Sequence, residues 1–182
     1  MRRQGKALSN GARMTDLRLR HDGDDERIAF VIRRAFGSET EVDLVADLRS
    51  DGDMLCELVA EREGAGIVGH VAFSRLDVAF ADRDIRGAAL APLAVLPTHQ
   101  RHGIGRALVE EGLKHLRAKN IDLVIVLGDP AYYARFGFSA LLARLLQTPY
   151  SGDGLQALEL RAGVLGKHAW DVTYPPAFAK LS

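Results

Sequence analysis

Residues 100–106, QRHGIGR, combine glycines and basic side chains in a pattern that could bind phosphate. They follow an apolar run, ALAPLAVLP, that ends at Pro97 and is typical of a buried strand. Gly103 and Gly105 have no Cβ, so a ligand could approach their backbone closely. If a helix begins here, its first N–H groups are unpaired and its dipole adds partial positive charge. A pyrophosphate suits that arrangement, although a glycine-rich helix start also occurs with a purely structural role.

Two other kinds of phosphate loop fit the sequence less well. A triphosphate-binding P-loop requires Gly-Lys followed by Ser or Thr, but the Gly-Lys pair at 166–167 is followed by His168. A dinucleotide fingerprint requires a third glycine, and Leu108 stands at that position. It also requires an acidic residue that closes the next strand, and Asp129, which follows Gly128, is a poor substitute. A dinucleotide-binding module is therefore a minor alternative.

The segment 90–116, LAPLAVLPTHQRHGIGRALVEEGLKHL, closely resembles the acyl-CoA-binding motif of the GNAT superfamily of N-acetyltransferases. In that family the strand before the loop carries a bulge and splays from the next parallel strand to admit pantetheine. The loop and the helix start then hold the CoA pyrophosphate. The resemblance therefore implies acetyl-CoA as the acyl donor. It places pantetheine and the thioester along Leu93, Ala94 and Val95, and the pyrophosphate on Gln100, Arg101, His102, Gly103, Ile104, Gly105 and Arg106.

A second match to the family is YYARFGF at 132–138, which follows a GDPAYY-type helix start. The family often has an aromatic-Tyr pair four residues before a Gly-Phe, and Tyr133 stands in that place. The resemblance implies that Tyr133 protonates the leaving thiolate, since a phenol with a reference pKa of about 10 is neutral at pH 7. The alternative is a packed aromatic with a surface hydroxyl. Tyr132 and Phe136 are expected on the core-facing side of this helix.

Two positions depart from the family pattern. His102 stands where the family often has Arg or Lys, and Val126 stands where many members have an asparagine that contacts pantetheine. Backbone N–H groups do most of the pyrophosphate binding, so little loss is expected from His102. The resemblance also implies that the backbone N–H of Val95 polarises the thioester carbonyl, in the manner of an oxyanion hole.

The sequence indicates several candidates for a general base and selects none. Glu39, Glu41 and Glu57 lie on elements near the expected acceptor side, and water could also deprotonate the amine. His70, inside IVGHVAF, is more typical of a sheet histidine than of a base. Cys56 lies in an apolar strand and indicates a small buried hydrophobe, so direct attack in a ternary complex is favoured over an acyl-cysteine route. The scattered histidines predict no metal site.

The order of elements predicts an α/β fold with a mixed, mostly antiparallel central sheet of six to seven strands flanked by helices, including a parallel splayed pair. A helix at 103–118 leads into an apolar strand at 123–127, which indicates a right-handed crossover. Ser38, with a glutamate three residues on, predicts a capping box. The Asp-Pro pair at 129–130 predicts a short helix that Gly137 ends. Strands are expected at 15–20, 54–62, 67–80, 88–96, 123–127, from 138, and at 155–160.

Length and composition are those of one globular domain. The chain has 182 residues, 47% of them hydrophobic, with 24 basic and 24 acidic side chains. Residues 1–14 carry basic but no acidic side chains and no apolar core of a signal peptide, so a disordered extension is expected there, followed by one domain at 15–182. The balanced charge and the absence of a long apolar segment predict neither nucleic-acid nor membrane binding. A single cysteine fits a cytoplasmic location.

These features together predict an N-acetyltransferase that transfers an acetyl group from acetyl-CoA to a primary amine. The acceptor would be a small-molecule amine, a peptide N-terminus or a lysine, and a homodimer is possible. A non-catalytic acyl-CoA-binding sensor is the main alternative, because it would keep the QRHGIG loop without needing Tyr133. Residues 161–182 match no motif and could cover the acceptor cleft or an oligomer face.

Overall fold

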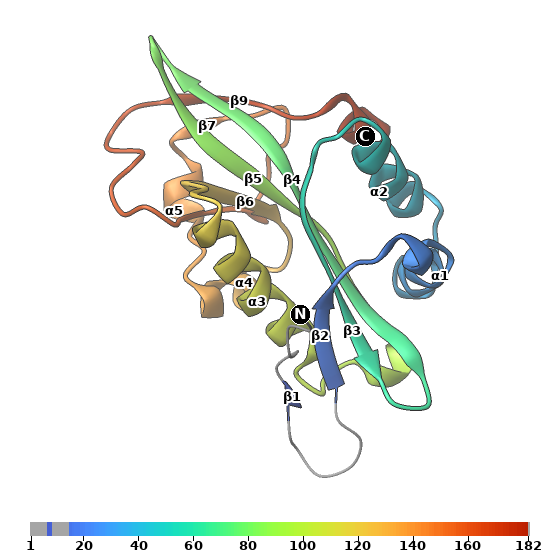
Figure 1. Ribbon diagram of the computed structural model, residues 1–182. Coiled ribbons are helices and arrows are strands. Elements are labelled where there is room, and N and C mark those ends of the chain that lie inside the picture. Colours follow the sequence, from blue (N-terminus) through green and yellow to red (C-terminus); the bar gives the residue numbers. More distant parts are fainter. Residues whose placement is uncertain (1–6, 9–14, 182) are drawn as a thin grey trace.

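The strands expected from the apolar and alternating segments form one sheet, with helices on both faces (Figure 1). The computed structural model describes Ala7–Leu8 and residues 15–181. Within that part of the chain the sheet has nine strands, and seven of them follow the order β1-β2-β3-β4-β5-β6-β8. The bounds are β1 Ala7–Leu8, β2 Thr15–Leu19, β3 Met54–Arg62, β4 Gly66–Phe80, β5 Arg83–Val95, β6 Leu123–Leu127, β7 Leu146–Gln147, β8 Leu155–Glu159 and β9 Trp170–Thr173.

The sheet is mixed and mostly antiparallel, which confirms the predicted fold class. β5 and β6 are parallel, as are the short β7 and β9, and the other pairs are antiparallel. Three of the nine strands were not predicted: β1 and β7, each of two residues, and β9, of four. Strands this short leave little sequence pattern, because alternation needs at least about four residues to be recognised.

Helices cover the two faces of the sheet unequally. α1 and α2 lie on one face, and α3, α4 and α5 lie on the other (Figure 1). α3 buries one apolar side, which includes Ile104, Leu108 and Leu116, against β3 and β4. None of the described helices is both long and apolar enough to cross a membrane. The helices are α1 Asp25–Phe36, α2 Thr40–Ser50, α3 Ile104–Ala118, α4 Pro130–Tyr133 and α5 Ala140–Ala143, with 3-10 turns at Asp22–Asp24, Pro97–His99, Ala134–Phe136 and Pro176–Leu181.

β5 leaves β6 partway along its length, and this separation creates the space for a site. The parallel register pairs Gly87 with Leu123 and ends where Ala89 meets Ile125, whereas β5 continues to Val95. On its other edge β5 pairs with β4, with a register shift at residues 90–93. Pro92 lies in this irregular stretch, where a proline is tolerated because it has no N–H to donate to a ladder.

Some local expectations were wrong. The Ser38 hydroxyl donates to the Glu41 carboxylate instead of capping the backbone, and α2 begins at Thr40. The strand expected from 138 is reduced to an isolated bridge between Ser139 and Ala157. The Ser139 hydroxyl accepts the N–H of Leu141 at 3.1 Å, which starts α5 at once.

The expected disordered extension at 1–14 lies outside the described residues, apart from Ala7–Leu8. These two residues form β1 and pair with Thr15 and Asp16 of β2. The boundary at residue 15 stays a prediction.

Gly112 lets α3 pack closely on the sheet, and we expect its replacement to destabilise the protein. A Cβ built on Gly112 would lie 2.2 Å from Cε2 of Phe73, a fully buried side chain of β4. Gly112→Ala should therefore lower the free energy of unfolding by about 1–3 kcal/mol, even though alanine favours helices. Urea denaturation measures this. Gly23→Ala is the control, since its Cβ meets nothing within 4 Å. Equal stability of the two variants would contradict the packing described.

Candidate active site

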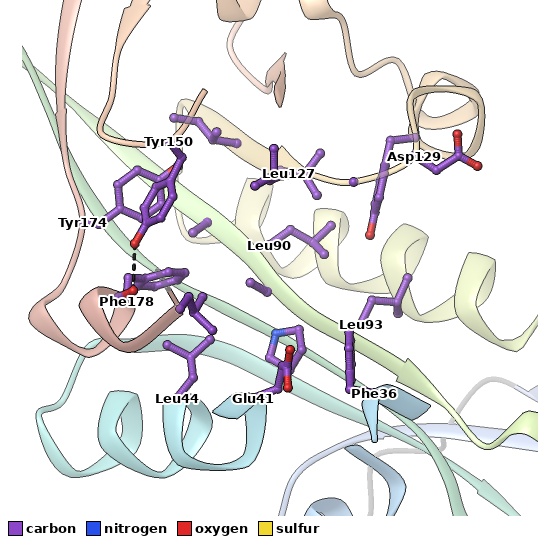
Figure 2. A pocket seen from close by; sticks show the side chains of 18 residues that line it. Phe36, Glu41, Leu44, Leu90, Leu93, Leu127, Asp129, Tyr150, Tyr174 and Phe178 are labelled. Carbon is purple, nitrogen blue, oxygen red and sulfur yellow. Dashed lines mark hydrogen bonds between the residues drawn. The ribbon is translucent and has the colours of Figure 1, made fainter. Parts of the chain in front are cut away.

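A cavity of about 380 Å³ lies where β5 and β6 separate. It is within the size range of small-molecule sites. The ends of β5 and β6 and the start of α4 form one part of its wall, and the end of α1, α2 and the C-terminal segment form the other. Figure 2 shows Phe36, Glu41 and Leu44 on one side of the cavity, with Leu127 and Asp129 on the opposite side. The cavity therefore reaches both faces of the sheet.

The end of β5 directs its side chains to two different environments. Leu93 lines the cavity, and Val95 is half-buried close to the start of α3. Ala94 is only 1% exposed and pairs with His70 of β4. Its side chain lies on the face of the sheet opposite to that of Leu93. Any contact of Ala94 with a donor on the Leu93 side would therefore involve its backbone.

The loop from 96 to 103 is held to β5 by its own polar groups. Nε2 of Gln100 donates to the Val95 carbonyl at 3.1 Å, so this side chain is used to fix the loop. Arg101 and Gly103 have φ of 62° and 80°, both in the left-handed region of backbone conformation. Glycine adopts this conformation easily, which explains the glycine at position 103. Arg101 and His102 are exposed. The loop thus presents two cationic or ionisable side chains around a helix start.

The first turn of α3 offers N–H groups beside β5 and α4. The helical ladder starts with the N–H of Ala107, which donates to the Gly103 carbonyl at 3.0 Å, so the preceding N–H groups have no acceptor within the helix. A Cβ built on Gly105 would lie 2.9 Å from Oη of Tyr132 and 3.6 Å from Cγ2 of Val95. The absence of a side chain at Gly105 therefore leaves a narrow space between α3, α4 and the end of β5.

The side chains of Ile104 and Arg106 are engaged elsewhere. Ile104 is buried, with its Cγ2 against Gly69 of β4. Arg106 forms an exposed ion pair with Glu110, at 2.7 Å between Nε and Oε1. Any binding of a phosphate by these two residues would rest mainly on their backbone N–H groups.

The short helix α4 places Tyr133 in the cavity wall. Oδ1 of Asp129 accepts the N–H of Ala131 at 2.9 Å, which is the N-cap predicted from the sequence. Tyr133 is 9% exposed, and its ring lies over Gly128, where a Cβ would come within 2.5 Å of Cε2. Burial raises the pKa of Tyr133 above its usual value, so the phenol is protonated. Tyr132 and Phe136 are partly buried and pack against the core, as expected, but Tyr133 is more buried than either.

The three carboxylates considered as general bases, Glu39, Glu41 and Glu57, lie in different environments. Glu57 is buried and accepts hydrogen bonds from His70 at 2.7 Å and from Nε of Arg49 at 3.0 Å. Although burial alone would raise its pKa, these hydrogen bonds lower the pKa of Glu57 to about 2. Glu39 is exposed and paired with Arg33. Glu41 alone of the three lines the cavity.

Two other reactive groups lie away from the cavity wall. His70 is fully buried, and burial lowers its pKa; its Nδ1 has no hydrogen-bond partner among the described residues. Cys56 is buried, and burial raises the pKa of its thiol to about 11, which agrees with the expectation of a small buried hydrophobe.

Sequence reasoning did not select the individual residues of one part of the cavity wall, although it named residues 161–182 as a segment that could cover the acceptor cleft. Tyr150, Tyr174 and Phe178 form an aromatic cluster on the side of α2, and Leu181 lies beside them in the cavity lining. The aromatic residues of TYPPAF were the one available signal, and no spacing rule connects them to a site more than 80 residues earlier in the chain, at about Leu93.

Comparisons with known proteins agree with this geometry. Residues 16–141 match the model of the acetyltransferase (GNAT) domain. Escherichia coli K12 has two similar proteins, both called uncharacterized N-acetyltransferases. YhbS is 43% identical over 115 residues, covering 63% of this chain and 68% of YhbS, and YjhQ is 40% identical over 117 residues, covering 63% and 64%.

Solved structures extend the similarity to nearly the whole chain. The crystal structure of E. coli YhbS in complex with CoA has a TM-score of 0.85 and 33% identity, covering 96% of this chain and 97% of that one. A GNAT acetyltransferase from Brucella melitensis in complex with acetyl-CoA has a TM-score of 0.73 and 31% identity, covering 90% and 97%. With its splayed strand pair and this match over most of its length, the chain belongs to the GNAT acetyltransferase family.

Proposed function

We propose that this protein transfers the acetyl group of acetyl-CoA to a primary amine by direct attack in a ternary complex. It is an acetyl-CoA-dependent acyltransferase by family, and the two structural relatives described above were solved with CoA and with acetyl-CoA. The main support for the ternary mechanism is the cavity at the β5–β6 separation, which joins Leu93 and Tyr133 on one side to α1 and α2 on the other. Donor and acceptor can then approach from opposite faces of the sheet.

The donor would bind along β5 and at the start of α3. The free N–H groups at Gly103–Arg106 suit a pyrophosphate, with Arg101 and His102 adding charge. Pantetheine would follow Leu93 and Val95 into the space that β6 leaves.

The backbone N–H of Val95 would polarise the thioester carbonyl. The N–H of Leu96 donates to the Val68 carbonyl on β4 at 2.9 Å. Successive N–H groups of a strand point to opposite edges, so the N–H of Val95 points toward the edge where pairing with β6 has ended. A donor fixed at that edge stabilises the oxyanion that forms when the amine attacks.

The chemical step then needs three proton movements. The ammonium ion loses a proton to solvent, and the neutral amine nitrogen attacks the carbonyl carbon of the thioester. The nitrogen loses a second proton to solvent as the C–S bond breaks, which leaves the neutral amide. Tyr133 donates its proton to the departing sulfur and is restored from solvent. Burial raises the pKa of Tyr133, but an apolar site raises the pKa of the thiol by the same effect, so the transfer stays feasible.

Isothermal titration with CoA, followed by an acetyl-transfer assay on an amine panel, tests the proposal. We expect CoA to bind and at least one amine to release CoA thiol from acetyl-CoA in step with N-acetyl product. CoA binding without turnover of any amine would favour the non-catalytic sensor. A cytoplasmic location and a homodimer stay predictions.

A further inference from the structure

The rim of the cavity exposes apolar side chains to solvent. Phe36, Leu127 and Leu181 are 45%, 56% and 36% exposed, and all three line the cavity. Single exposed apolar residues are common on protein surfaces, but several large ones gathered around one opening are typical of a binding site. The opening therefore suits a ligand with an apolar body.

Aromatic rings form the inner wall on the α2 side. The rings of Tyr150 and Tyr174 pack edge to face with centroids 4.8 Å apart, and those of Tyr174 and Phe178 do so at 5.1 Å. The Tyr150 hydroxyl donates to the Phe178 carbonyl at 2.8 Å, so its polar atom is satisfied within the wall (Figure 2). Burial raises the pKa of Tyr174 to about 12, so this phenol is neutral. The wall offers ring surface for a flat apolar group.

Glu41 is the carboxylate of the cavity lining that could bind a ligand. Among the described lining residues only Glu41 and Asp129 have carboxyl side chains, and none has a basic side chain. Asp129 caps α4, and its carboxylate turns toward that helix start (Figure 2). Glu41 is held by the hydroxyl of Ser38, which leaves it further acceptor positions. A carboxylate set in an apolar wall favours a cationic partner, because charge is costly to bury unpaired.

We propose that the acceptor is a primary amine on an aromatic or similarly flat apolar group, and that Glu41 binds its ammonium. This rests on the proposed acetyl transfer. Glu41 and the ring cluster lie on the side of the cavity away from α4, where the acceptor would enter. A long acyl chain of the donor could also fill an apolar cavity. It would gain nothing from Glu41, however, and would strip water from that carboxylate.

Binding to the CoA-loaded protein tests the acceptor separately from turnover. The probes are 2-phenylethylamine, 2-phenylethanol, which lacks the ammonium, and ethylamine, which lacks the ring. We expect 2-phenylethylamine to bind about tenfold or more tightly than either of the others. Glu41→Gln should weaken 2-phenylethylamine about tenfold and leave 2-phenylethanol unchanged. Glu39→Gln, an exposed neighbour paired with Arg33, is the matched control and should bind like the wild type.

Several outcomes would overturn the acceptor assignment. Equal binding of ethylamine and 2-phenylethylamine, or unchanged binding by Glu41→Gln, would do so. So would tighter binding of octanoyl-CoA than of acetyl-CoA, which would make the cavity an acyl tunnel. Turnover of spermidine or a lysine peptide but not of 2-phenylethylamine would also overturn it, while the transferase proposal would stand. Binding of 2-phenylethylamine as expected, with no amine ever acetylated, would instead refute the transferase and leave the amine site.

Discussion

Tyr133→Phe is expected to lower kcat for acetyl transfer roughly 100-fold while the KM for acetyl-CoA stays within about twofold. The substitution removes one hydroxyl and keeps the ring that packs over Gly128 and against Phe138. The ring positions should therefore be preserved, and the loss should fall on protonation of the thiolate. Steady-state kinetics with thiol detection measures both constants. Unchanged kcat would remove Tyr133 from the role of acid.

Tyr132→Phe is the matched control for this variant. Its ring meets Tyr133 edge-on at 5.0 Å, and its hydroxyl lies beside Gly105 at the start of α3. Loss of that hydroxyl should affect the KM for acetyl-CoA more than kcat. A fall in kcat equal to that of Tyr133→Phe would mean that the pair, and not Tyr133 alone, supports the step.

The pH profile gives a second readout for Tyr133. An acid must be protonated to act, and burial raises the pKa of Tyr133 above its usual value of about 10. The activity should therefore rise with pH as the amine loses its proton, and it should not fall again below about pH 10. A decline starting near pH 8 would show that a different, less buried acid serves the thiolate.

Gly105→Val is expected to weaken CoA binding by about 100-fold or more, the second large effect. A side chain at Gly105 would meet Oη of Tyr132 at 2.9 Å and the side chains of Val95 and Leu93 just beyond. In the proposed donor site it would occupy the space through which pantetheine passes from the helix start to the cavity, and its methyl groups would crowd the side chains of Tyr132, Val95 and Leu93. Calorimetry with CoA measures the change, and the unfolding midpoint checks the fold.

Graded substitutions make the Gly105 result specific. Gly105→Ala should produce a smaller loss than Gly105→Val, and Gly23→Ala should bind CoA like the wild type because its Cβ meets nothing within 4 Å. CoA affinity that is unchanged in Gly105→Val would place the donor elsewhere.

The elements of the proposed donor site could be predicted from the sequence because their signals are local. A strand, a glycine-containing turn and a helix start lie within residues 90–116, and the structure places them as β5, the loop and α3. The Asp129 cap followed by Pro130 is equally local and was confirmed. The separation of β5 from β6 was expected only through resemblance, since no residue pattern states where parallel pairing ends.

Short elements and side-chain directions were the weaker predictions. Ser139 caps a helix where a strand was expected, because one hydroxyl bond to the N–H of Leu141 competes with strand pairing. Tyr132 and Tyr133 are adjacent on a single turn of helix, so spacing alone could not decide which is more buried. Contacts with Gly128 and Phe138 decide it, and these depend on the tertiary structure.

The proposed acceptor half could be predicted only in outline, because its parts are far apart in the chain. Glu41 lies on α2, whereas Tyr150, Tyr174 and Phe178 lie more than 100 residues later, and only the folded sheet brings them to one cavity. Sequence reasoning left Glu39, Glu41 and Glu57 equivalent. Their surroundings separate them, since Glu57 is buried with His70 and Arg49 while Glu39 is paired at the surface.

The transfer of a labelled acetyl group tests the central claim most directly. Wild-type protein and Tyr133→Phe would each be mixed with acetyl-CoA carrying a 13C-labelled carbonyl and with a panel of primary amines, and product would be followed by NMR. The account predicts that the label appears as an amide in the wild type, with an equal amount of free CoA, and about 100-fold more slowly in Tyr133→Phe at unchanged CoA affinity. Label that stays in the thioester with every amine, or equal rates for the two proteins, would contradict it.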